Sequence, residues 1–146
     1  MTVLTVASTL VYISAALPAA QTAVAFGALV WTKIGEVTDI GSVLGRAYNT
    51  ATHAPIDSAQ QVEKKASYKL PGADFTCGWD EADAGQIMLM AAANSNAVYS
   101  FKVLKQGGAI RYFTAQAMKF VENNGTVDNV VQGQFSLLRQ TDTIVA

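Results

Sequence analysis

The chain has 146 residues, the length of one ordinary domain, and such a chain can bury roughly 70% of its unfolded surface. The formal net charge is −1, so nothing in the charge suggests tight nucleic-acid binding, which would call for a basic patch and many phosphate contacts. Charged residues make up 14% of the chain, against about 25% in average globular domains. Because monomers rarely expose large apolar patches, this composition predicts a subunit that buries much of its surface against other copies.

The first residues are apolar and uncharged, and the first charged side chain is Lys33. A secretory signal needs a positively charged start, which residues 1–32 do not have. A transmembrane helix needs about 20 mainly apolar residues, but Thr, Ser, Gln, Tyr and Pro18 interrupt every window here. We therefore expect an extended N-terminal interaction arm over residues 1–24 and a single domain over residues 25–146.

Strand patterns follow the expected arm. Residues 26–37 are rich in Val, Trp, Thr and Ile, the composition of a strand. Residues 41–61 are rich in Gly, Thr, Ser, Asn and Ala and predict a long loop, which compact domains seldom carry unless it is functional or an interaction element. Residues 62–70 alternate with the period of a half-buried strand, and residues 73–79 predict a further strand.

The period then changes, and residues 79–96 predict a helix. Asp80 is its expected N-cap, and Asp83 lies three residues on, in a capping-box-like position. Together with Glu81, these carboxylates suit the positive end of the helix dipole. One face of the predicted helix carries Ala84, Ile87, Met88 and Ala91.

The rest of the chain predicts three more strands, over residues 97–104, 109–121 and 127–140. The last two are joined through Asn124-Gly125, and Asn-Gly is a strong hairpin signal. One helix among about six strands predicts a mainly β fold. We expect an antiparallel β-sandwich or barrel with one flanking α-helix and the extended N-terminal arm.

Few residues suit catalysis or metal binding. The spacing of Asp80, Glu81 and Asp83 does not match the EF-hand pattern, and helix capping accounts for all three. Cys77 is the single cysteine and His53 the single histidine. A nucleophilic thiol needs a nearby base, and two side chains are too few for the usual zinc sites. Cys77 is expected to be a buried strand residue and His53 a loop or interface residue.

The stretch Gly41–Arg46 has the glycines of a phosphate-binding loop, but one spacer is missing and Arg replaces the Lys-Ser/Thr pair, so the Walker pattern fails. No Ser, His and Asp residues form a recognisable order. We therefore expect no enzymatic activity, no metal and no cofactor.

Three stretches of the sequence, distributed along nearly the whole chain, carry a recognisable pattern. They are ISAALPAAQTAVAFGALVWTKIGEVTDIG (13–41), PGADFTCGWDEADAGQIMLMAAAN (71–94) and VVQGQFSLLRQT (130–141). The first holds an Ala-Leu-Pro-Ala arm, an aromatic-Thr-x-Ile-Gly strand and a Val-Thr-Asp-Ile-Gly turn. The second holds a strand, an Asp-rich turn and a helix that opens with Asp-Ala-Gly-Gln. In their order and spacing, they resemble the major tail tube proteins of long-tailed (siphovirus-type) bacteriophages.

The resemblance implies a structural virion protein that is assembled in the host cytoplasm and resides in the phage tail. Such subunits form hexameric rings that stack into the tail tube, the conduit for genome delivery. The implied partners are other copies of the chain, a tape measure protein in the lumen, and tail tip and terminator proteins. DNA would pass transiently and without specific binding, and no membrane anchor is expected.

The resemblance also implies where neighbouring subunits meet. The arm and the long loop would reach from ring to ring, with interface candidates Tyr12, Ile13, Leu17, Pro18, Tyr48, His53 and Pro55. Since cationic rings would hold DNA phosphates, we expect a neutral to acidic lumen. Lys64, Lys65 and Lys69 should then be paired or point away from it.

Three other interpretations stay open. A tube protein of a contractile injection or secretion machine shares the fold, and a companion sheath protein would favour it. An envelope-anchored β-sandwich that uses residues 1–32 as its anchor would be recovered with membranes. A small enzyme built around Asp80, Glu81 and Asp83 would lose activity, rather than its fold, on Asp80→Ala.

Overall fold

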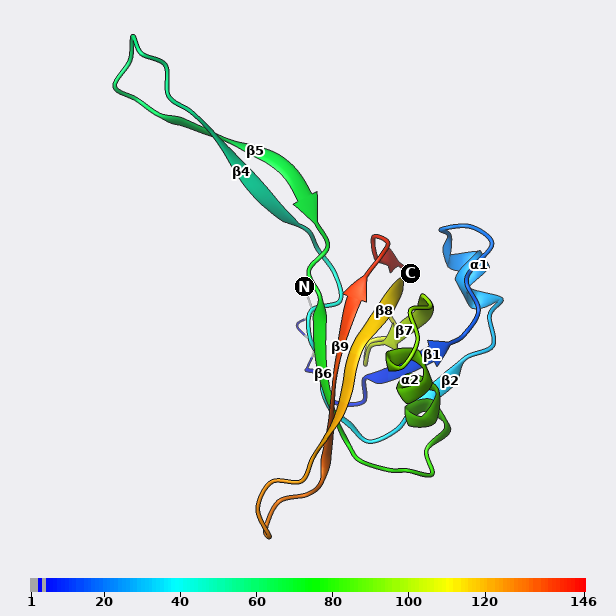
Figure 1. Cartoon of the computed structure of the whole chain (residues 1–146). Coiled ribbons are helices and arrows are strands. Elements are labelled where there is room, and N and C mark those ends of the chain that lie inside the picture. The colour runs from blue at the N-terminus through cyan, green and yellow to red at the C-terminus, as the bar shows by residue number, and fades with distance from the viewer. Residues whose placement is uncertain (1–2, 4) are drawn as a thin grey trace.

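The structure, a computed structural model, describes residue 3 and residues 5–146 (Figure 1). Within these residues, strands dominate and two helices accompany them. The elements in chain order are β1 (Leu10–Ser14), α1 (Ala23–Gly27), β2 (Thr32–Ile34), β3 (Val37–Asp39), β4 (Ala47–His53), β5 (Val62–Lys69), β6 (Ala73–Gly78), α2 (Ala84–Ala93), β7 (Tyr99–Leu104), β8 (Ile110–Asn123), β9 (Gln132–Arg139) and β10 (Ile144–Val145).

The main sheet is antiparallel and follows the order β2-β1-β7-β8-β9-β6-β3, with β10 also paired to β8. The long strand β8 joins two halves, because its start pairs with β7 and its end with β9. A register shift between Ala117 and Lys119 interrupts β8, and such bulges bend a strand. Figure 1 shows β1 and β2 running across the direction of β6, β8 and β9. The predicted mainly β, sandwich-like fold is confirmed, although the sheet is not closed into a barrel.

The core lies between the concave side of this sheet and α2. Two aromatic pairs stack within it, Phe75 on Phe135 with 5.0 Å between ring centroids, and Phe101 on Phe113 with 5.6 Å. Leu89 of α2 is fully buried against this cluster. Each stacked pair contributes about 0.5–1.5 kcal/mol beyond the area that it buries, so aromatic packing stabilises β6 against β9 in one half of the sheet and β7 against β8 in the other.

The N-terminal region differs from the expected arm. Strand β1 lies between β2 and β7, and its side chains Val11 and Ile13 are fully buried. The prediction of an arm over residues 1–24 is therefore wrong for residues 10–14, which are a central strand. Residues 23–27 form α1 rather than the start of a strand, and Phe26 packs on Tyr112 with 5.2 Å between ring centroids. Residues 1, 2 and 4 of the expected arm lie outside the described residues.

The predicted loop over residues 41–61 is also partly wrong, because β4 occupies residues 47–53 within it. β4 pairs with β5 in a separate two-stranded sheet, which projects from the body in Figure 1. Every residue after Ala47 in β4 is exposed, so this strand has no side that faces the core. Its sequence therefore shows no alternation of apolar and polar residues, which is the usual signal of a strand. The strand forms through its pairing with β5.

Helix α2 begins at Ala84, so Asp83 is its N-cap and the prediction of Asp80 as the cap is wrong. An Asp83 carboxylate oxygen accepts from the backbone N–H of Gln86 at 3.0 Å and from that of Gly35 at 3.1 Å. Asp80 instead closes the preceding turn, where its carboxylate accepts from the N–H of Ala82. The N-cap is therefore Asp83, whose carboxylate also accepts a hydrogen bond from the loop between β2 and β3.

Candidate assembly surfaces

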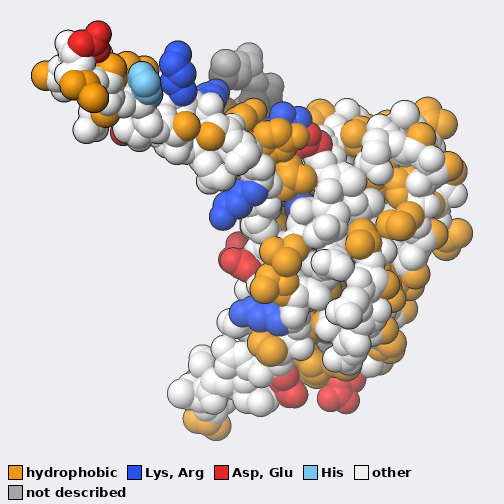
Figure 2. Space-filling model, turned by 45° about the horizontal axis from the view of Figure 1, so that its top comes forward, with side chains coloured by type: hydrophobic (Ala, Val, Ile, Leu, Met, Phe, Trp, Pro, Cys, Tyr) orange, Lys and Arg blue, Asp and Glu red, His pale blue; other side chains and the backbone are white. Residues whose placement is uncertain are grey.

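Among the described residues, the β4–β5 hairpin is the first surface without a partner elsewhere in the chain. Nearly all of its residues are exposed, and the two strands contact mainly each other. Ile56 at its tip is fully exposed, and Figure 2 shows hydrophobic side chains at the end that projects farthest. A two-stranded hairpin alone is only marginally stable in water. This hairpin therefore needs support at its root or from another molecule.

One face of the hairpin carries a row of cations and tyrosines. The Tyr48 and Tyr68 rings lie 5.5 Å apart across the strands. The Arg46 guanidinium lies 4.3 Å from the Tyr68 ring centroid, and the Lys65 ammonium lies 4.8 Å from that of Tyr48. Cation–π contacts of this kind contribute about 0.5–1 kcal/mol each at exposed sites. They stiffen the strand pair near its root.

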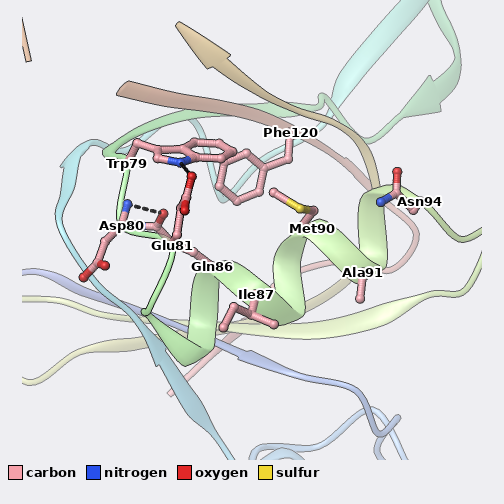
Figure 3. Close-up of a pocket in the computed structure, with 9 residues that line it drawn as sticks. All are labelled: Trp79, Asp80, Glu81, Gln86, Ile87, Met90, Ala91, Asn94 and Phe120. Carbon is pink, nitrogen blue, oxygen red and sulfur yellow. Dashed lines mark hydrogen bonds between the residues drawn. The ribbon is translucent and has the colours of Figure 1, made fainter. Parts of the chain in front are cut away.

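The second surface is an apolar groove of about 520 Å³ beside α2. Figure 3 shows Trp79 and Phe120 facing Met90 of the helix. The Trp79 ring meets Phe120 edge-on at 5.2 Å, and its indole N–H donates to Glu81 at 3.4 Å. The remaining lining residues are Asp80, Gln86, Ile87, Ala91 and Asn94.

Apolar side chains therefore occur on both faces of α2. Leu89 and Ala92 are buried in the core, while Ile87 is 57% exposed and Met90 39% exposed on the outer side. A helix that is hydrophobic all round is normally buried. The outer face of α2 is consequently an exposed apolar surface beside the groove.

The third surface is the open face of β6, β8 and β9. Along β6, Phe75 and Cys77 point into the core, whereas Asp74 is exposed and Thr76 half-buried on the other side. On β9, the residues facing outward are mainly amides and hydroxyls, including Gln132, Gln134 and Ser136. The Ser136 hydroxyl bonds to the Asp74 carboxylate, and Lys119 is the register partner of Ser136. One anion and one cation thus share a row on a face that is otherwise mostly uncharged.

The outer strands β2 and β3 have only three residues each and one neighbour each. Their free edges present backbone N–H and C=O groups that can pair with another chain. Short edge strands limit such pairing to a few bonds. The two edges lie at opposite ends of the strand order, which is the arrangement that head-to-tail pairing between copies requires.

The predicted interface residues fall into three groups. Ile13 is fully buried in the core and has no surface to offer a neighbour, because it belongs to β1. Tyr12 and Pro18 are half-buried, and the Tyr12 ring lies 4.3 Å from the Lys102 ammonium of its own chain. The exposed or partly exposed members are Leu17, Tyr48, His53 and Pro55, of which the last three lie on the hairpin.

The residues considered for chemistry do not meet. Cys77 is fully buried in β6, and burial raises the pKa of its thiol to about 11. His53 is exposed on the projecting hairpin. In the described part of the chain, no group of three or more His, Cys, Asp or Glu side chains is placed to hold a metal ion. None of the described helices is long and apolar enough to cross a membrane.

Sequence reasoning missed the groove beside α2 and the exposed tip residue Ile56. The groove needs Trp79 and Phe120, which come from distant parts of the chain. The available signal was the predicted apolar face of the helix, because its members Ala84, Ile87 and Ala91 are exposed, whereas Leu89 and Ala92 from another side of the helix are buried in the core.

No protein-family model matches the sequence, and no curated protein matches it. Comparison with solved structures defines the class through the fold: the chain has the tail-tube-like fold found in phage tails and contractile injection systems. The resemblance seen in the sequence is thereby confirmed at the level of the fold.

Three solved structures illustrate the similarity. A chain of the anti-feeding prophage baseplate, 6-fold symmetrised, matches with a TM-score of 0.67 and 10% identity over 100% of this chain and 97% of its own. A chain from the sheath/tube terminator of an extracellular contractile injection system matches with a TM-score of 0.65 and 8% identity, covering 100% and 98%. The SPP1 tail tube matches with a TM-score of 0.62 and 12% identity, covering 94% and 75%.

Proposed function

We propose that this chain is the structural subunit of a phage tail tube, in which hexameric rings stack into the conduit for the genome. The observation that carries the proposal is the β4–β5 hairpin, which projects from a tail-tube-like body and makes almost no contact with it. An exposed hydrophobic tip on such a hairpin is costly for a free monomer. It becomes favourable when the tip is buried on a subunit of the next ring.

Closure of the ring follows from the sheet edges. In the proposed ring, the edge strands of one subunit approach those of the next, so that their unpaired backbone groups bond between chains. Closing the ring removes free edges that would otherwise promote open-ended aggregation. Stacking of rings is head-to-tail and does not close, so it produces a filament.

The open face of β6, β8 and β9 is the surface that we assign to the lumen. Its outward residues combine Thr, Gln and Ser with the exposed apolar side chains of Val121 and Leu138, and Asp74 and Lys119 lie in one row on either side of Ser136. A mostly uncharged wall lets DNA slide, because it offers few cations to hold phosphates. Lys64, Lys65 and Lys69 belong to the hairpin rather than to this face. A tube in which Lys64, Lys65 or Lys69 forms unpaired rings facing the bore would contradict the assignment.

The remaining partners belong to the same proposal. A tape measure protein would occupy the lumen during assembly, and tail tip and terminator proteins would cover the two ends. DNA would be a transient, non-specific passenger. The protein would be assembled in the host cytoplasm and reside in the virion tail, without enzymatic activity.

The alternative is a tube subunit of a contractile injection or secretion machine. The solved structures of similar fold include a sheath–tube complex of such a system as well as the SPP1 tail tube. A sheath protein encoded beside this chain, and bound by its tubes, would favour the alternative.

Electron microscopy of the purified chain at rising concentration tests self-assembly. We expect hollow tubes or six-fold rings from the full chain. A variant in which residues 47–69 are replaced by two glycines should stay monomeric, since Ala47 and Lys69 are neighbours at the hairpin root. Ile56→Asp should also block stacking, whereas Ile56→Leu should not. Each variant is melted in parallel to show that the body is folded. A full chain that stays monomeric at every concentration would contradict self-assembly.

A further inference from the structure

The root of the β4–β5 hairpin is held by one buried arginine. Arg139, the last residue of β9, is only 5% exposed. Its guanidinium donates to the carbonyl oxygens of Val43 at 3.3 Å and Gly45 at 2.5 Å, on the segment that enters the hairpin. It also donates to the carbonyl oxygen of Pro71 at 3.0 Å, on the segment that leaves it. A single side chain therefore joins both root segments to the end of β9.

Such an arrangement is demanding, because burying a cation is unfavourable unless its donors are satisfied. None of the hydrogen bonds of Arg139 in the described structure reaches a carboxylate; its fourth partner is the Thr143 hydroxyl, at 2.8 Å. Burial lowers the pKa of Arg139 from its usual value. Backbone carbonyl oxygens replace the water that would otherwise accept from the guanidinium. The buried charge is therefore satisfied only while both root segments stay in place.

A second contact fixes the root from outside. Arg46, just before β4, forms a two-pronged ion pair with Asp142, and its Nε lies 3.1 Å from the carboxylate. Its guanidinium also stacks on Tyr68 of β5. The hydrogen bond from Arg46 lowers the pKa of Asp142, so the pair stays charged at neutral pH. Planar two-pronged pairs of this kind restrict orientation as well as distance.

Without these contacts, the root would be a hinge. Gly45 has φ of 116°, a conformation in which glycine is unstrained, and Gly72 lies on the other root segment. Within the described part of the chain, the hairpin strands contact mainly each other, so no other described element fixes their direction. Two glycine-containing segments would let the hairpin swing relative to the sheet.

We propose that Arg139 and the Arg46–Asp142 pair, here called the root clamp, are positioning residues that fix the direction of the hairpin in the free subunit. The inference rests on the proposed function, in which the hairpin binds a neighbouring subunit. A hairpin that is already oriented loses less conformational freedom on binding. The root clamp thereby lowers the concentration at which subunits assemble.

The direction of the hairpin can be measured in the monomer by double electron–electron resonance. Spin labels are attached at Ala59→Cys, in the exposed loop of the hairpin, and at Ala91→Cys, on the outer side of α2. Cys77 stays unlabelled because it is fully buried and its thiol pKa is raised to about 11. We expect a single narrow distance distribution for the otherwise unchanged chain.

The variants are chosen to leave the fold intact. Asp142→Asn removes the charge of an exposed residue and should broaden the distribution, whereas Asp142→Glu should keep it narrow. Arg139→Lys, which keeps the charge but loses the planar fork, should also broaden it. Equal widths for the unchanged chain and Asp142→Asn would overturn the proposal, as would a distribution that is broad in the unchanged chain.

Assembly supplies the second measurement, followed by light scattering with unlabelled protein. Asp142→Asn should raise the critical concentration about tenfold, with a melting temperature close to that of the unchanged chain because exposed pairs contribute little stability. A broadened distribution with an unchanged critical concentration would overturn the role in assembly. If the unchanged chain never assembles, the proposed function fails, while the distance measurement still decides whether the clamp orients the hairpin.

Discussion

Replacing Gly85 by alanine tests how closely α2 packs on the sheet. A Cβ atom at this position would lie 2.2 Å from the Lys33 carbonyl oxygen and 2.6 Å from the Ile34 Cα. Both are backbone atoms of β2, so no side-chain rotation relieves the clash and the helix must move. Movement would also stretch the hydrogen bonds from the Gln86 amide to the carbonyl oxygens of Gly35 and Gly78, which are 3.2 and 2.7 Å long.

The expected magnitude follows from three contributions. Overpacking costs about 1–3 kcal/mol, and each weakened hydrogen bond costs up to about 1 kcal/mol. Alanine regains about 1 kcal/mol through its higher helix propensity. The net loss in unfolding free energy is about 2–3 kcal/mol, which corresponds to a fall in melting temperature of about 6–9 °C for a chain of this size.

Gly27→Ala is the matched control, because Gly27 lies in α1 and a Cβ there meets nothing within 4 Å. This variant should gain about 0.4–1 kcal/mol, since alanine has fewer unfolded conformations to lose. Both proteins are melted by scanning calorimetry beside the unchanged chain. If Gly85→Ala melts at or above the temperature of Gly27→Ala, the close packing of α2 on β2 is refuted.

Asp83→Ala should lower the unfolding free energy in urea by about 2 kcal/mol, because two backbone N–H groups lose their acceptor; Asp80→Ala should cost less, and equal losses would contradict the assignment of the cap. Phe135→Ala should cost about 3–5 kcal/mol by thermal melting, and a loss below about 1 kcal/mol would show that the stack on Phe75 is not central to the core. The Cys77 thiol, whose pKa burial raises to about 11, should react with a disulfide reagent at pH 8 only as fast as the protein unfolds. The thiol pKa of Cys77 is higher in the folded than in the unfolded chain, so the contribution of Cys77 to folding stability is complete below pH 9 and is lost as the pH rises toward 11. Rapid reaction of the folded protein with the reagent would show that the thiol is accessible.

Strands whose side chains alternate between apolar and polar could be predicted from local sequence. In β6 and β9 the core residues Phe75, Phe135 and Leu137 are separated by polar ones, and a period of two is visible within a few residues. The turn after β8 was also local information, because Gly125 adopts a φ of 65° that Asn-Gly sequences favour. The helix was recognisable from its change of period.

Residues that lack a local signal take up their positions through contacts that form only when the chain folds. Val11 and Ile13 resemble an apolar arm until β7 pairs with them and buries them in the core. Arg139 resembles an ordinary surface cation, yet three carbonyl oxygens distant in the sequence surround its guanidinium. Alternation and capping depend on neighbours along the chain, whereas burial and hydrogen-bond partners depend on segments that meet only after folding. The assembly surfaces and the root clamp belong to the second kind.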